Sequence, residues 1–108
     1  MPQDIKITGY SGKKRVFYVT TSSGEGYSST FEGINELMYQ LIITSSTSTT
    51  TFKVDILESD GTKLFDGSKV TFTGYAKIAQ PLLLIGDIKV KIYSASADEQ
   101  FTCKLYTV

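Results

Sequence analysis

Four acidic residues gather around one glycine-containing turn: Asp55, Glu58, Asp60 and Asp66. Oxygen ligands in such a setting suit a hard cation such as calcium. The spacing does not match an EF-hand loop, because Thr62 and Lys63 follow the turn and no glutamate closes it. The chemistry of a hairpin turn explains these residues better, so no metal site is predicted.

Catalysis has few candidate residues in this sequence. There is no histidine, which removes the Ser/His/Asp and Cys/His arrangements and the usual zinc sites. Paired carboxylates or a serine activated by a lysine would remain for a hydrolase. The acidic residues fall mostly in turns or on outward strand positions, and no Gly-x-Ser-x-Gly elbow occurs. No catalytic residue and no cofactor are predicted, and a hydrolase is only the third hypothesis.

Two further segments resemble chemical motifs only superficially. SSGEGYSS at 22–29 lacks the Lys-Ser/Thr ending of a phosphate-binding loop and is expected to be a mobile loop. The basic triplet at 13–15 is expected to be a solvated strand start. The single cysteine, Cys103, lies between Phe101 and Leu105 and is expected to be a buried, inert thiol.

Length and composition indicate one folded domain, residues 1–108. Apolar residues make up 41% and charged residues 20%, with 11 basic and 11 acidic side chains. This balance favours neither disorder nor nonspecific attraction to nucleic acid or an anionic membrane. The N-terminus has no apolar segment behind a basic start, and the longest apolar run, PLLLI at 81–85, cannot span a bilayer. No secretion signal, membrane partner or nucleic-acid partner is predicted.

Alternation with a period of two dominates the chain and predicts strands with one dry face. Phe101, Cys103 and Leu105 point inward in the last of them, and Ile88, Val90 and Ile92 do so in the one before. Strands are predicted at 14–21, 37–44, 51–56, 69–73, 75–84, 87–93 and 100–107, with Pro81 at an edge or bend.

Two hairpins are predicted from turn residues. Asp60-Gly61 favours a two-residue type I′ turn, which would pair Glu58 with Lys63 and Ile56 with Phe65. Residues 94–99 would join the last two strands as a second hairpin and so align Val90 with Cys103.

These patterns predict an all-β fold, a single antiparallel β-sandwich of about 7–8 strands with Greek-key or jelly-roll topology. A small barrel is the alternative. The segment 29–42 is ambiguous, because Ser29 with Glu32 could form a capping box and five apolar residues also fit a helix: Phe31, Ile34, Leu37, Met38 and Leu41. A short helical turn near 31–36 followed by a strand is predicted.

The second predicted hairpin creates a candidate contact surface. Its register sets outward Lys89 opposite Lys104, a like-charge pair that is mildly destabilising unless a neighbouring carboxylate neutralises it. Lysines beside tyrosines suit an acidic or polar protein partner. The predicted protein-contact residues on this face are Lys89, Lys91, Lys104, Tyr93 and Tyr106.

Eight consecutive hydroxyl residues, TSSTSTTT at 44–51, separate two predicted strands. Both neighbours need the same core, so a domain linker is disfavoured. A glycosylated stalk is disfavoured as well, since the run has no proline and the chain has no export signal. Ser45, Ser46, Thr47 and Ser48 are predicted to form an exposed turn that contacts a partner, with residues 49–51 already in the next strand.

The order of FKVDILESDGTKLF, Thr73-Gly74, PLLLIGDIKVKIY and SASADEQFTCKLYTV resembles small β-sandwich structural proteins of tailed-bacteriophage virions, of the head-decoration or accessory type. The resemblance covers about residues 37–108. It implies a protein without catalysis that binds a capsid or another virion component in the host cytoplasm, with homo-oligomers allowed. The alternative is a carbohydrate- or receptor-binding module using Tyr10, Tyr27 and Tyr75.

Overall fold

A computed structural model describes residues 12–108, and within them the chain is built from strands and turns with no helix. No helix that could cross a membrane therefore occurs in this part of the chain. The nine strands are β1 (Lys13–Thr20), β2 (Gly26–Tyr27), β3 (Phe31–Ser45), β4 (Thr51–Glu58), β5 (Lys63–Asp66), β6 (Phe72–Thr73), β7 (Tyr75–Ile78), β8 (Leu82–Tyr93) and β9 (Gln100–Thr107).

All strand pairs are antiparallel, and together they form one sheet that folds over into two layers. One layer has the order β1-β9-β3-β7, and the other has the order β2-β8-β4-β5. Four strands in each layer with this connectivity make a jelly roll. The predicted all-β sandwich is therefore confirmed.

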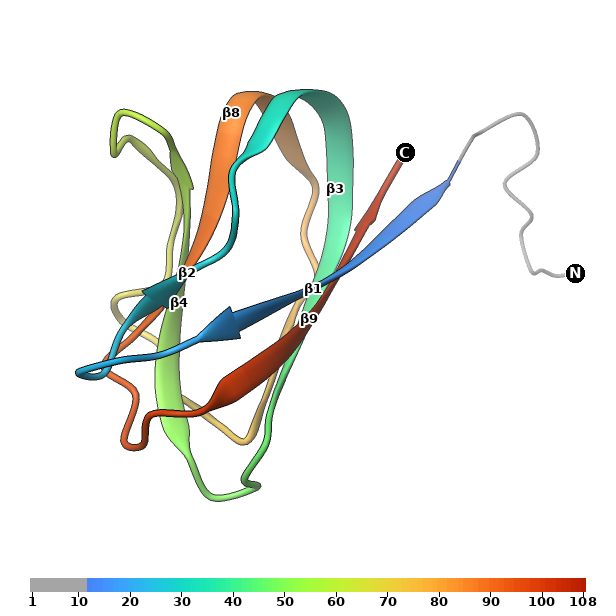
Figure 1. The fold of residues 1–108 in the computed structure, drawn as a ribbon. Coiled ribbons are helices and arrows are strands. Elements are labelled where there is room, and N and C mark those ends of the chain that lie inside the picture. Colours follow the sequence, from blue (N-terminus) through green and yellow to red (C-terminus); the bar gives the residue numbers. More distant parts are fainter. Residues whose placement is uncertain (1–11) are drawn as a thin grey trace, which may run out of the picture.

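The long strands β3 and β8 link the two layers. Their first halves pair with each other, from Ile34 with Gly86 to Met38 with Leu82. Their second halves diverge, so that β3 joins β9 and β7 while β8 joins β4. Figure 1 shows the two strands arching over together and then separating into the two layers.

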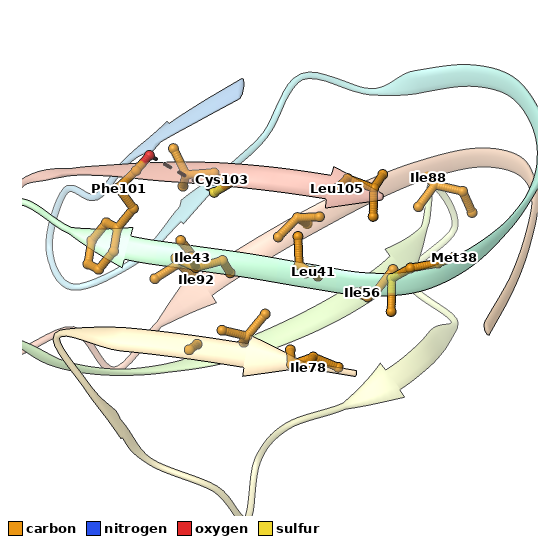
Figure 2. Packing of buried hydrophobic residues seen from close by; sticks show 14 of the residues in the cluster. Met38, Leu41, Ile43, Ile56, Ile78, Ile88, Ile92, Phe101, Cys103 and Leu105 are labelled. Atoms are coloured by element: carbon orange, nitrogen blue, oxygen red, sulfur yellow. Dashed lines mark hydrogen bonds between the residues drawn. The ribbon is translucent and has the colours of Figure 1, made fainter. Parts of the chain in front are cut away.

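The core lies between the layers and is lined by the inward residues of each strand. Met38, Leu41 and Ile43 of β3 point toward the same interior as Ile56 of β4 and Ile92 of β8 (Figure 2). Phe52 is fully buried, and its ring lies 4.9 Å from that of Phe101 and 5.9 Å from that of Phe72. Each such ring contributes roughly 1.5–3 kcal/mol when fully buried.

The predicted helical turn near 31–36 is wrong, because residues 31–45 form strand β3, in which Gly33 alone has a positive φ, of 60°. Two irregularities explain the misleading spacing, one between Phe31 and Ile34 and one between Met38 and Gln40. Each bulge inserts an extra residue, so the inward positions become 31, 34, 36, 38 and 41. The resulting three-residue gaps imitate helical periodicity in a strand.

The first predicted hairpin exists, but its turn differs. Ile56 pairs with Phe65 as expected, whereas Lys63 lies opposite Leu57 and not Glu58. Of the two predicted turn residues, Asp60 and Gly61, only Gly61 has a positive φ, of 94°. Its N–H donates to the carbonyl of Glu58 at 2.9 Å. This is a three-residue loop, residues 59–61, closed by the Glu58 N–H donating to the Thr62 carbonyl. An irregularity between Lys63 and Phe65 then restores the expected pairing of Ile56 with Phe65.

The second predicted hairpin is wrong, since β8 and β9 do not pair. Residues 94–99 carry the chain from one layer to the other, and β3 lies between the two strands in the sheet order. Val90 lies opposite Ile56 and Cys103 opposite both Phe17 and Ile43. Alternation correctly identified the inward side chains, but it carries no information about which strands are neighbours.

The structure also shows the surroundings of Cys103, Pro81 and the segment 22–29. Cys103 is fully buried, and burial raises the pKa of its thiol to about 12. Pro81 lies in the bend between β7 and β8 as expected, while strand 69–73 is reduced to two residues. The segment 22–29 holds a tight turn followed by β2. Ser22 and Glu25 exchange backbone hydrogen bonds, and the Asp98 carboxylate accepts the N–H groups of Ser23 and Gly24.

Candidate protein-contact surfaces

The lysines predicted to face one another lie on different layers. Lys89 sits on β8 opposite Leu57, whereas Lys104 sits on β9 opposite Val16 and Ile42. Both side chains point outward, so the outward assignment is correct and the shared face is not. The predicted contact residues consequently form two separate groups, with Lys89, Lys91 and Tyr93 on one layer and Lys104 and Tyr106 on the other.

On the β2-β8-β4-β5 layer the lysines are engaged within the chain. Lys91 lies 3.7 Å from the Glu25 carboxylate, and its ammonium group lies over the rings of Tyr27 and Tyr93 at 5.6 and 5.0 Å. Lys89 lies over the Tyr27 ring at 5.5 Å. Such cation–π contacts and ion pairs hold these side chains against the surface.

Asp55 anchors the centre of the same face. Although it points outward, it is only 2% exposed, and it accepts hydrogen bonds from the Gly67 N–H at 2.9 Å and the Tyr93 hydroxyl at 3.0 Å. The Lys63 ammonium group lies 3.3 Å away. Burial raises the pKa of Tyr93 to about 12, with a further contribution from the Asp55 carboxylate.

The acidic residues around the β4-β5 turn have structural roles. Lys63 bridges Asp55 and Asp66, and Asp60 and Asp66 each accept a backbone N–H two residues ahead, at 2.9 Å. These turn hydrogen bonds lower the pKa of both Asp60 and Asp66. In residues 12–108 no group of three or more metal-ligating side chains converges.

The outer face of the β1-β9-β3-β7 layer carries three lysines and three tyrosines that cross-strand register brings together. Residues that are partners across the four strands form rows on this face. In the first row Tyr18 on β1 and Tyr75 on β7 lie at the two ends, with Thr102 and Thr44 between them. The next row runs from Val16 through Lys104 and Ile42 to Lys77. Lys14 and Tyr106 are partners in the third row. We call this the tyrosine-lysine surface: Lys14, Lys77, Lys104, Tyr18, Tyr75 and Tyr106.

An exposed apolar group adjoins this surface where β3 and β8 pair. Leu83 is 57% exposed, Ile85 54% and Leu37 39%, and Leu37 pairs directly with Leu83. Two residues along β3, the Tyr39 ring packs 6.1 Å from that of Tyr106 on the tyrosine-lysine surface. We call Leu37, Leu83 and Ile85 the arch patch. None of these three residues was among the contact residues predicted from the sequence.

The hydroxyl-rich tip is a turn held by its own polar groups. Strand β3 ends at Ser45, which is buried and donates to the carbonyls of Gly74 and Thr47. Ser46 donates to the Gln100 carbonyl, and the Thr47 N–H donates to the Glu99 carboxylate. Strand β4 begins only at Thr51, so residues 49–50 belong to the turn and not to the strand. Ser46, Thr47 and Ser48 are exposed, and their contact role stays a prediction.

Glu36 forms a polar cluster that sequence reasoning missed. It occupies an inward position between Ile34 and Met38, and its carboxylate accepts hydrogen bonds from Lys13, Arg15 and Thr107. The Arg15 guanidinium binds both carboxylate oxygens, and this bond is the main reason that the pKa of Glu36 lies far below its usual range. Lys13 and Arg15 are therefore not a free basic patch. The sequence did carry one sign of this cluster, because a glutamate at an inward position of a strand needs hydrogen-bond donors around it.

The tyrosines considered for glycan binding do not form one platform. Tyr27 lies on the face of β2 and β8 beneath two lysines, and Tyr75 lies on β7 in the other layer. Tyr10 is outside the described residues. Tyr27 and Tyr75 therefore share no binding site among residues 12–108, and carbohydrate binding stays an untested prediction.

Comparison with known proteins finds similarity in structure but none in sequence. No protein-family model matches the chain, and no curated protein matches it. Among solved structures, the chain is similar to one described as the capsid asymmetric unit of cyanophage Pam1, with a TM-score of 0.45 and 12% identity over 99% of this chain and 91% of that one. At this level of similarity the match does not assign a function, which has to be argued from the chain's own residues.

Proposed function

We propose that this protein is a non-enzymatic structural protein of a phage virion that decorates or stabilises the capsid. The observation that carries the proposal is the arch patch, where three aliphatic side chains are exposed beside one another on paired strands. Adjacent exposed aliphatic side chains of this kind suit a protein interface. The sequence resemblance to virion accessory proteins supplies the class of partner.

The chemistry of the carboxylates supports a structural role. Glu36 binds Arg15, Asp55 binds the Gly67 N–H and Lys63, and Asp98 holds the turn at residues 23–24. Each is committed to maintaining the fold and does not point into a shared cleft. The protein would act as one domain in the virion, bound to capsid proteins and free to form homo-oligomers.

A modest contact area is sufficient for such a role. A capsid presents the same binding site many times, so a decorating protein that bridges neighbouring sites gains avidity from weak contacts. The rigid two-layer sheet keeps the arch patch in a fixed geometry, which lowers the entropy cost of binding.

Co-sedimentation with purified capsids tests the proposal. The wild-type protein should pellet with capsids, and Leu83→Glu should weaken this binding by about tenfold, the effect of about 1.4 kcal/mol. The matched control is Val70→Glu, because Val70 is also exposed but lies in the loop after β5. A wild-type protein that stays in the supernatant and remains strictly monomeric would contradict the proposal.

A further inference from the structure

The outer face of the β1-β9-β3-β7 layer carries charge of one sign only. Lys14, Lys77 and Lys104 point outward from it, and β1, β7, β9 and residues 37–45 contain no aspartate or glutamate. Among residues 12–108, the ion pairs involve none of these three lysines. Their charge is not compensated by the described part of the chain.

The opposite layer provides an internal comparison, because two of its lysines have carboxylate partners. Lys91 has Glu25 as an ion-pair partner and two tyrosine rings against it, and Lys63 has Asp55 and Asp66. The fold thus supplies carboxylates for two lysines of one face, whereas Lys89 there packs on the Tyr27 ring, and it supplies none for the three lysines of the other face. The difference between the faces is not a consequence of composition, since the whole chain has as many acidic as basic residues.

Shape and apolar content also suit a protein partner. Tyr18 and Tyr75 are 56% and 51% exposed on the two outer strands. In the central row Ile42 lies between Lys104 and Lys77, and Val16 flanks Lys104 on the other side. Four strands about 4.8 Å apart, rising about 3.3 Å per residue, present a face of roughly 19 by 26 Å. This is at most about 500 Å², because β7 has only four residues, so an interface of the standard size of roughly 800 Å² per partner would extend onto the adjoining arch patch.

We propose that the tyrosine-lysine surface is the docking face for an acidic surface of a protein partner. The inference rests on the proposed function and specifies the chemistry of its partner. Carboxylates would pair with Lys14, Lys77 and Lys104 while apolar groups cover Val16 and Ile42. A nucleic acid fits less well, because the lysines are single and separated by apolar residues, whereas phosphate backbones favour clustered basic side chains.

Backbone amide chemical shifts of the isotope-labelled full chain, titrated with poly-L-glutamate, map the acidic-binding face directly. The shifts should move at Val16, Ile42 and Lys104 and stay unchanged at Lys89 and Lys91, with no response to poly-L-lysine. A single-stranded DNA oligonucleotide should bind more weakly than poly-L-glutamate. Shifts centred on Lys89, shifts spread over all lysines, no response at low salt, or tighter binding of the oligonucleotide would each overturn the inference.

Two matched charge reversals separate this inference from the proposed function. Lys104→Glu should weaken poly-L-glutamate binding about tenfold and Lys89→Glu less than about twofold, because only Lys104 would face the partner's carboxylates. In capsid co-sedimentation the same order is expected. If both variants bind capsids as well as the wild type, the docking face is wrong and the capsid role stands. If the wild type does not bind capsids, the capsid role fails independently of the poly-L-glutamate result.

Discussion

The Glu36 carboxylate shows how a single side chain can join distant parts of the chain. Its partners Lys13 and Arg15 lie on β1, and Thr107, which is fully buried, lies at the end of β9. The Glu36 side chain retains only 10% of its exposure, so its charge depends on these donors. A carboxylate that accepts several hydrogen bonds in such a setting stabilises the folded state only while it is ionised.

Glu36→Gln should lower the free energy of unfolding at pH 7 by about 2 kcal/mol, the usual range for hydrogen bonds to a charged group. The folded-state pKa is lowered, so the contribution is complete above the unfolded pKa of about 4.3 and is lost as the pH falls below it. Urea unfolding at pH 7, 5 and 3 measures this, and the gap between variant and wild type should shrink at pH 3.

Glu32→Gln is the matched control for that measurement, since Glu32 lies on the same strand and is exposed. It should change stability little at any of the three pH values. A gap between wild type and Glu36→Gln that is as large at pH 3 as at pH 7 would show that the carboxylate charge is not the cause.

At the scale of elements, Gly26 shows how closely the two layers approach. A Cβ atom at this position would collide with the Thr20 carbonyl and meet Val19 Cγ1 at 3.1 Å. The short strand β2 can therefore reach the end of β1 only without a side chain at residue 26. This contact joins the edge of one layer to the edge of the other.

Gly26→Ala should destabilise the protein by about 1–3 kcal/mol, since the added methyl group forces a backbone shift at a close contact. Thermal unfolding followed by circular dichroism measures the loss. Gly12→Ala is the control, because a Cβ atom at Gly12 would meet nothing within 4 Å. Equal melting temperatures for the two variants would contradict the close approach.

The sequence predicted the strands well and their partners poorly. The inward residues of β9 follow strict alternation, which depends only on local geometry, and the last strand was predicted with its observed bounds. The neighbours of β9 are β1 and β3, and the assumption that consecutive strands pair gave β8. The candidate contact face inherited this error, because Lys89 and Lys104 were placed together by an assumed register.

Bulges set a second limit on prediction at this scale. Those at residues 31–34 and 38–40 made β3 resemble a helix, and in the β4-β5 pair an irregularity between Lys63 and Phe65 left Lys63 opposite Leu57. A bulge depends on the partner strand as well as on its own residues, so single-sequence periodicity does not locate it. The arch patch was missed for the same reason, since its exposure depends on how β3 and β8 pair.

For the molecule as a whole, the jelly roll makes each layer from segments that are distant in sequence. The first described strand pairs with the last, and β3 contributes to both layers. No contiguous segment of the described chain encloses a core of its own, because both layers must be present to cover Phe52 and Phe101. Folding and unfolding should consequently involve the entire sheet at once.

Denaturant unfolding should therefore show one cooperative transition, with coincident midpoints for far-ultraviolet circular dichroism and tyrosine fluorescence. Tyrosines on both layers report in the fluorescence measurement, including Tyr18 on β1 and Tyr93 on β8. Two separated transitions, or midpoints that differ between the probes, would argue against the proposed single domain.

The pairing of Lys13 with Thr107 has a mechanical consequence. A pulling force applied between these two residues acts across β1 and β9 and not along them, so it opens the hydrogen-bond ladder one rung at a time, like a zipper. Glu36 binds side chains from both strands at this end, and it would therefore be loaded first. Resistance to tension between Lys13 and Thr107 would depend less on the size of the core than on the single Glu36 carboxylate that binds both strands at this point.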